Sequence, residues 1–150
     1  MPAIQLPEGY SYAVVAASST IYLNIWQMSR VNKARKQAGI AYPQLYAEKA
    51  EVEASQSALV FNCTQRAHQN TLENAPHVIL AMLVTGLKYP YVAAGFGGLW
   101  VVGRVLYTLG YSSGHPSNRN ARGGILSTAS FLGLILATTF TVGKLLMAEF

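Results

Sequence analysis

The sequence predicts an all-α integral membrane protein, a bundle of four transmembrane helices in a single domain, residues 1–150. Three observations predict this class. Hydrophobic residues make up 51% of the 150-residue chain and charged residues only 11%, whereas an ordinary soluble domain has about 25% charged residues. Apolar stretches recur along the whole chain. The basic residues gather between these stretches, as they do in the cytosolic loops of membrane proteins.

The first predicted helix covers residues 10–28. Its apolar stretch Tyr10–Met28 has about the 20 residues that a span requires. Only Glu8 is charged in Met1–Gly9, so the segment lacks the basic leader of a secretory signal peptide. We therefore expect a permanent helix.

The second predicted helix covers residues 55–87. Its apolar part, Ala75–Leu87, is too short to cross a bilayer alone. The helix must therefore run back through FNCTQRAHQNTLENAP, Phe61–Pro76. That extension puts ionisable side chains in or at the edge of the bilayer, where they are costly and by default suggest function.

The third and fourth predicted helices cover residues 91–111 and 123–147. The tight turn Lys88–Pro90 makes a hairpin of the second and third helices, and SSGHPSNRNARGG has the turn residues of a true loop before the fourth. Both helices are rich in glycine. Small residues let helices approach closely in lipid, so we expect tight helix contacts.

The basic residues predict the orientation. Those of the first and third loops are Arg30, Lys33, Arg35, Lys36, Lys49, Arg119 and Arg122. By the positive-inside rule these loops face the cytosol. The net charge of +5 is therefore an orientation signal, and the chain lacks the interleaved aromatic and basic residues of a nucleic-acid platform. We expect no nucleic-acid partner and, with a single cysteine and three scattered histidines, no metal.

Two polar helix faces mark the candidate site. Arg66, Asn70 and Glu73 are spaced i, i+4, i+7, and Arg104, Tyr107 and Tyr111 are spaced i, i+3, i+7, so each set shares one face of its helix. One interpretation is an internal ion-pair network that only fixes helix packing. The other is a binding site, because arginine clamps carboxylates and glutamate receives an ammonium. A small zwitterionic peptide with more than one carboxylate fits these side chains.

Three segments resemble signature sequences of a known family. They are FNCTQRAHQNTLENAP, GRVLYTLGYSSGHPSNR and NKARKQAGIAYP. These segments are similar to those of the MAPEG family, the membrane-associated proteins in eicosanoid and glutathione metabolism, and closest to its type 3 microsomal glutathione transferase branch. They cover about half the chain, and the four-helix layout matches as well.

The resemblance implies a homotrimer in the endoplasmic reticulum, nuclear envelope or outer mitochondrial membrane. Glutathione would bind between neighbouring subunits, at a site facing the cytosol. By position, the resemblance assigns glutathione binding to Arg66, Asn70, Glu73, Tyr107 and Tyr111 of one subunit and to Arg35 and His68 of its neighbour. Arg119 resembles the catalytic arginine that faces the sulfur, with Arg122, three residues on, as the alternative. Arg104 matches a family arginine with a structural or accessory role.

The implied activity is glutathione transfer or glutathione-dependent peroxidase chemistry. A bound glutathione thiolate would attack a lipophilic electrophile or a lipid hydroperoxide that arrives from the membrane lipid. A leukotriene C4 synthase-like activity is a further possibility. Two residues weaken it: the leukotriene-forming branch has glutamine at the position of His68 and tyrosine at the position of Asn74. Two alternatives stay open: a non-enzymatic lipid-binding scaffold of the same family, and a structural membrane subunit without affinity for glutathione.

Overall fold

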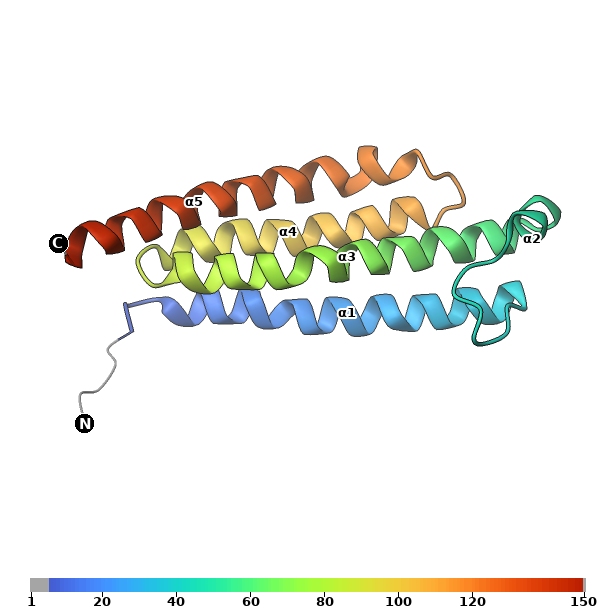
Figure 1. Ribbon diagram of the computed structural model, residues 1–150, viewed down its shortest axis with the longest axis horizontal. Coiled ribbons are helices and arrows are strands. Elements are labelled where there is room, and N and C mark those ends of the chain that lie inside the picture. Colours follow the sequence, from blue (N-terminus) through green and yellow to red (C-terminus); the bar gives the residue numbers. More distant parts are fainter. Residues whose placement is uncertain (1–5, 150) are drawn as a thin grey trace.

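The chain folds into an elongated bundle of long helices that lie side by side (Figure 1). The computed structural model describes residues 6–149, and all the regular structure in that range is helical. The start of α1 and the end of α5 lie at the same end of the bundle (Figure 1). The elements are α1 (Tyr10–Ala38), α2 (Lys49–Ala54), α3 (Gln56–Gly86), α4 (Pro90–Tyr111), the π-helical turn η1 (Asn120–Gly124) and α5 (Ile125–Glu149).

Helices α3 and α4 form the centre of the bundle. Each packs against the other and against both outer helices, α1 and α5, whereas α1 and α5 make no contact in the described range. Pro90 begins α4 directly after the short α3–α4 turn, a position where the missing proline N–H costs nothing. The polar faces predicted on α3 and α4 therefore belong to neighbouring helices.

Helix α1 is ten residues longer than the apolar stretch that predicted it, ending at Ala38 instead of Met28. Hydropathy finds only the apolar part of a helix, while the following Arg, Lys, Ala and Gln residues are good helix formers. Arg35 and Lys36 lie in the last turn, where cations favour the helix dipole, and Gly39 ends the helix at a φ of 69°. At 1.5 Å per residue α1 is about 44 Å long, longer than the roughly 30 Å hydrocarbon core of a bilayer.

The second predicted helix corresponds to α3, with the short α2 added before it. Glu48 and Glu51 form a capping box at the start of α2, which satisfies backbone N–H groups that have no partner inside the helix. Ser55 is extended (φ −146°, ψ 119°) and separates the two helices. α3 contains Pro76 in its interior, where the missing N–H removes one helical hydrogen bond.

Glycines allow close approach of α4 to its neighbours, as the sequence predicted. A Cβ on Gly97 would lie 2.1 Å from the sulfur of Met82 in α3, and one on Gly103 would lie 2.7 Å from the backbone nitrogen of Ser127 in α5. On Gly123 a Cβ would lie 2.3 Å from the Gly103 carbonyl. α4 and the turn into α5 therefore meet backbone to backbone, and α5 starts at Ile125 after the π-helical turn rather than at residue 123.

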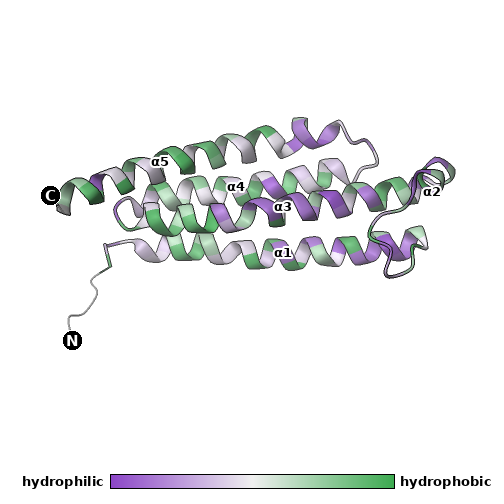
Figure 2. Ribbon diagram, in the orientation of Figure 1, coloured by the Kyte–Doolittle hydropathy of each residue, from purple (hydrophilic) through white to green (hydrophobic). Residues whose placement is uncertain are grey.

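Two helices are long and apolar enough to cross a membrane, Pro90–Tyr111 and Asn120–Ala148. α1 is not one of them, since serine, threonine, asparagine and glutamine interrupt its apolar residues. Its outer surface is nevertheless apolar: Val15, Ile21 and Ile25 are all more than half exposed. Hydrophilic residues gather in the middle of α3 and at the end of the bundle that holds α2 (Figure 2).

Two apolar clusters lie along the bundle. One contains Met82, Trp100 and Leu134 together with alanines of α1 and α3. The other contains Val31, Ile40 and Phe61 beside the α1–α2 loop. Polar residues occupy the interval between them in the sequence of α3, from Thr64 to Asn74, and this interval carries the candidate site.

Candidate functional site

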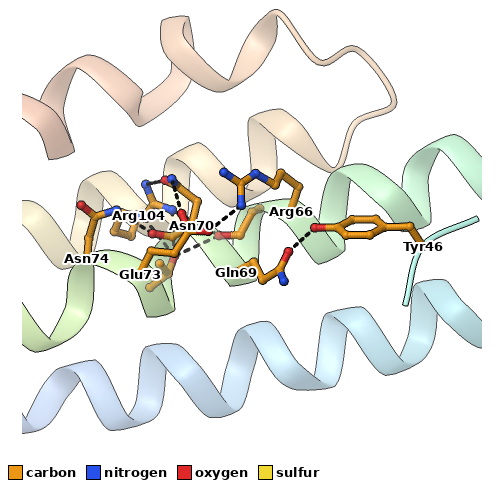
Figure 3. A network of polar contacts seen from close by, with 9 residues as sticks. Tyr46, Arg66, Gln69, Asn70, Glu73, Asn74 and Arg104 are labelled. Carbon is orange, nitrogen blue, oxygen red and sulfur yellow. Dashed lines mark hydrogen bonds and ion pairs between the residues drawn. The ribbon is translucent and has the colours of Figure 1, made fainter. Parts of the chain in front are cut away.

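The predicted α3 face forms a connected set of polar contacts (Figure 3). Arg66 Nη1 lies 2.7 Å from Glu73 Oε1, and Asn70 Nδ2 donates to Glu73 Oε2 at 3.3 Å. The side chains of Arg66 and Glu73 are 45% and 51% exposed. Water and salt screen an ion pair in such a position. Both groups can therefore change partner when a ligand binds.

Arg104 meets the same segment from α4, but it is buried, with only 4% of its surface exposed. Its Nη1 donates to Asn70 Oδ1 at 3.0 Å, and its Nε and Nη2 donate to Thr71 Oγ1 at 3.0 and 2.8 Å. Nη2 also donates to the Ala67 carbonyl at 3.2 Å. These contacts meet the requirement that a buried guanidinium be hydrogen-bonded. They fix α4 against α3 and orient Asn70.

The buried network continues to α1 through residues that the sequence analysis missed. Gln27 is fully buried, and its Nε2 lies 2.8 Å from Thr71 Oγ1 and 2.7 Å from Thr108 Oγ1. Thr71 thus joins Gln27 of α1 to Arg104 of α4. The signal was present in the sequence, since a glutamine inside an apolar stretch needs a buried partner, but the identity of that partner depends on helix packing.

Two tyrosine rings at the end of α4 lie between two guanidiniums, one from Arg104 in α4 and one from Arg119 just before η1. The Arg104 guanidinium lies 4.1 Å from the centre of the Tyr107 ring, and Tyr107 packs edge to face with Tyr111 at 5.6 Å. The Arg119 guanidinium lies 5.2 Å from the centre of the Tyr111 ring, within the range of a cation–π contact. Arg119 also donates to the Pro116 carbonyl at 2.9 Å.

Tyr107 is the point where the two predicted faces meet. The Arg104 guanidinium packs on its ring and also holds Asn70 of the α3 face, and the neighbouring Tyr111 ring packs against Arg119. With Glu73 as the carboxylate of this group, Arg66, Arg104, Arg119 and Glu73 together carry a net charge of +2 (three positive, one negative). Without the buried Arg104, two cations face one anion, a net charge of +1. The arrangement favours an anionic ligand that also offers one positive group.

Tyr46, in the loop before α2, closes one side of this face, and no sequence pattern had singled it out. Its hydroxyl donates to Gln69 Oε1 (Figure 3) and lies within the electrostatic reach of Arg66. Burial raises the pKa of Tyr46 above its ordinary value, against the opposing effect of Arg66. The phenol therefore stays protonated at neutral pH and can donate a hydrogen bond.

Arg35 and His68 lie apart from this face within one chain. His68 Nε2 is 2.6 Å from Asn24 Oδ1, on the side of α3 that faces α1. Arg35 is buried between the rings of Tyr42 and Phe61, and it donates to the Gln44 carbonyl at 2.6 Å. The structure thus gives Arg35 a role in holding the α1–α2 loop.

The remaining predicted arginine, Arg122, lies in η1 and is exposed. Arg119 immediately precedes η1 and is half-buried. Only Arg119 of these two has a cation–π contact with Tyr111. In the described range no group of three or more His, Cys, Asp or Glu residues could hold a metal ion.

A comparison with known protein families decides the membership of the chain. The sequence profile of the MAPEG family matches residues 13–140, a range that includes every residue of the α3 and α4 faces. The chain belongs to the MAPEG family. It is therefore a membrane protein, in agreement with its two span-length apolar helices. The MAPEG family includes glutathione transferases and related enzymes.

Proposed function

We propose that this MAPEG protein is a membrane-bound glutathione transferase and glutathione-dependent peroxidase, most similar in its motifs to the type 3 microsomal branch. It would act as a homotrimer of four-span subunits, in the endoplasmic reticulum, nuclear envelope or outer mitochondrial membrane, with the site toward the cytosol. The observation that carries the proposal is the exposed Arg66–Glu73 pair, which Asn70 and Arg104 connect to the ring of Tyr107. The neighbouring Tyr111 ring in turn meets Arg119.

Glutathione matches the charges of this face. It carries two carboxylates, one ammonium group and two amides. The exposed Arg66 guanidinium can take a carboxylate in two parallel hydrogen bonds, and Glu73 can receive the ammonium. Asn70, held by Arg104, and the protonated Tyr46 supply hydrogen bonds for the amides and the other carboxylate. Arg35 and His68 would contribute from the neighbouring subunit.

Arg119 would activate the sulfur. A free thiol has a pKa of about 8.5, so only a few per cent is thiolate at pH 7. A guanidinium beside the sulfur favours the anion and stays protonated itself. Lowering the thiol pKa by about two units requires about 2.7 kcal/mol and raises the thiolate fraction at pH 7 roughly 20-fold.

Two reactions follow from a bound thiolate. In transfer, sulfur forms a bond to an electrophilic carbon, and the displaced group leaves with the bonding electron pair. In peroxide reduction, sulfur attacks the terminal oxygen and the O–O bond breaks, releasing an alcohol. A second glutathione then converts the oxidised sulfur to the disulfide and water, so that two thiols are oxidised for each hydroperoxide reduced.

The test uses the purified full chain with glutathione and either an aromatic halide or a fatty-acid hydroperoxide. Wild type should give thiolate absorbance near 240 nm and turn over at least one of the two substrates. Arg119→Ala should lose roughly 20-fold in rate at pH 7, the change in thiolate fraction. Arg122→Ala is the matched control, and it should keep its rate. An inactive wild type, or full activity of Arg119→Ala, would contradict the proposal.

A second candidate function is a non-enzymatic lipid-binding scaffold. The observation that favours it is a cavity of about 320 Å³ between α3 and α5, lined mainly by apolar side chains that include Leu80, Phe131 and Ile135. A scaffold would bind lipid without ionising glutathione. Lipid binding by a wild type that shows no thiolate absorbance would therefore favour this function.

A further inference from the structure

A polar cavity that contains none of the residues of the Arg66 face lies where α1, α3 and the end of α4 meet. It has a volume of about 230 Å³ and is enclosed by α1, the first turns of α3 and the end of α4. Its polar lining comes from Arg30, Lys33, Gln37, Thr64 and Ser112, and none of its lining residues is acidic. The cavity therefore presents two cations, the Ser112 hydroxyl and an amide without a neutralising carboxylate, while the Thr64 hydroxyl donates to the Val60 carbonyl of its own helix.

The Arg30 guanidinium is only partly satisfied by the protein. Its Nη2 donates to Ser112 Oγ at 2.9 Å, and its Cζ lies 5.2 Å from the centre of the Trp26 ring. Its Nε is buried and has no hydrogen-bond acceptor within the described residues. Buried donors without an acceptor are rare in folded proteins. Arg30 thus offers an anion a charge that no carboxylate of the cavity lining neutralises.

The position of the cavity along α1 indicates which anion reaches it. Arg30 and Lys33 begin the basic part of α1, directly after its apolar part. Tryptophan and basic residues at such a boundary mark the headgroup level of a bilayer, with the basic side toward the cytosol. Basic pockets at this depth bind the headgroups of anionic lipids. The volume of about 230 Å³ is about that of eight liquid water molecules, enough for a phosphate group with part of its hydration.

We propose that this cavity binds the phosphate of an anionic membrane lipid, with Arg30 and Lys33 as its cations and Ser112, whose Oγ accepts from Arg30 and keeps its own proton to donate, as hydroxyl partner. The acyl chains would run along the exposed apolar surface of α1, beside Ile25 and Ile21. The site shares no residue with the proposed glutathione site, and it does not depend on that function.

The test measures lipid binding to the detergent-solubilised full chain by calorimetry. The probes are dioctanoyl phosphatidic acid, dioctanoyl phosphatidylcholine and inorganic phosphate. Phosphatidic acid should bind most tightly. Arg30→Gln should weaken its binding about tenfold, the usual effect of losing a charge-assisted hydrogen bond. Lys33→Gln, at an exposed position where folding is not at risk, should weaken it about threefold.

Lys36→Gln is the matched control, because it removes the same charge from the same end of α1 at a residue outside the cavity. It should change the dissociation constant less than about twofold. Equal weakening by Lys33→Gln and Lys36→Gln would mean that the attraction is only diffuse, and it would overturn the site. Equal affinity for inorganic phosphate and phosphatidic acid would overturn the lipid as its ligand, and so would equal affinity for phosphatidylcholine.

Discussion

Arg66 and Arg104 contact the same short segment of α3 from opposite environments. Arg66 lies on the exposed side, where a single ion pair to Glu73 holds it. Arg104 lies on the buried side, where its hydrogen bonds go to neutral oxygens of Ala67, Asn70 and Thr71. The difference separates two roles that the sequence alone could not separate. The buried arginine holds helices together, and the exposed arginine is available to a ligand.

The largest effect should come from the buried arginine. Arg104→Met removes four hydrogen bonds and leaves the Asn70 amide oxygen without its donor. We expect the free energy of unfolding to fall by about 2–4 kcal/mol, from the lost bonds and imperfect filling of the space. Thermal unfolding in detergent measures it. Arg66→Met is the control and should leave the melting temperature nearly unchanged. If both variants destabilised the protein equally, the assignment of a structural role to Arg104 alone would be wrong.

The exposed arginine should control affinity. Arg66→Ala should weaken glutathione binding at least about tenfold, since a charge-assisted pair to a carboxylate is lost, while the fold is retained. Equilibrium binding with the full chain gives the dissociation constant. Arg66→Lys keeps the charge but cannot bind in two parallel hydrogen bonds, so it should recover only part of the loss. If Arg66→Ala bound glutathione as tightly as wild type, the Arg66 face would not be part of the glutathione site.

A smaller effect should follow from Tyr46. Tyr46→Phe removes one neutral hydrogen bond near Arg66 and should weaken glutathione binding about threefold. Because burial raises the pKa of the Tyr46 phenol, the hydroxyl keeps its proton up to at least about pH 9. The ratio of wild-type to variant affinity should therefore be flat between neutral pH and about pH 9. A ratio that changed with pH in that window would show that Tyr46 titrates there.

The smallest effect should come from Gln27. Its Oε1 is buried without a partner in the described range, and Thr71 and Thr108 also bond to carbonyls of their own helices. Gln27→Leu removes an unsatisfied group while it fills the space, so the free energy of unfolding should change by less than about 1 kcal/mol. Gln27→Ala, which leaves a cavity, should be clearly worse. If Gln27→Leu lowered the free energy of unfolding more than Gln27→Ala, the expectation that filling the space matters more than the hydrogen bonds of Gln27 would be wrong.

The sequence predicted the all-helical class, and the i, i+4, i+7 spacing of Arg66, Asn70 and Glu73 predicted their shared face. Hydropathy did not predict that α1 continues to Ala38, because charged residues can extend a helix that apolar residues begin. Periodicity also could not tell which of two arginines would be buried. That depends on the packing of α4 between α3 and α5, which the glycines permit. Tyr46 reaches Gln69 from the α1–α2 loop, and Gln27 reaches Thr71 and Thr108 through the packing of α1 against α3 and α4.

The close contacts of α4 have a consequence for how this helix tolerates mutation. In an isolated helix alanine is favoured over glycine by roughly 1 kcal/mol. At Gly98 a Cβ meets nothing within 4 Å, whereas at Gly97 and Gly103 it meets a neighbouring helix at less than 3 Å. Alanine should therefore stabilise α4 at one glycine and destabilise it at another. In a saturation-mutagenesis scan alanine should be accepted at Gly98 and rejected at Gly103, where the new Cβ would meet the Ser127 backbone. The glycines that reject alanine would then identify the positions where α4 contacts its neighbours.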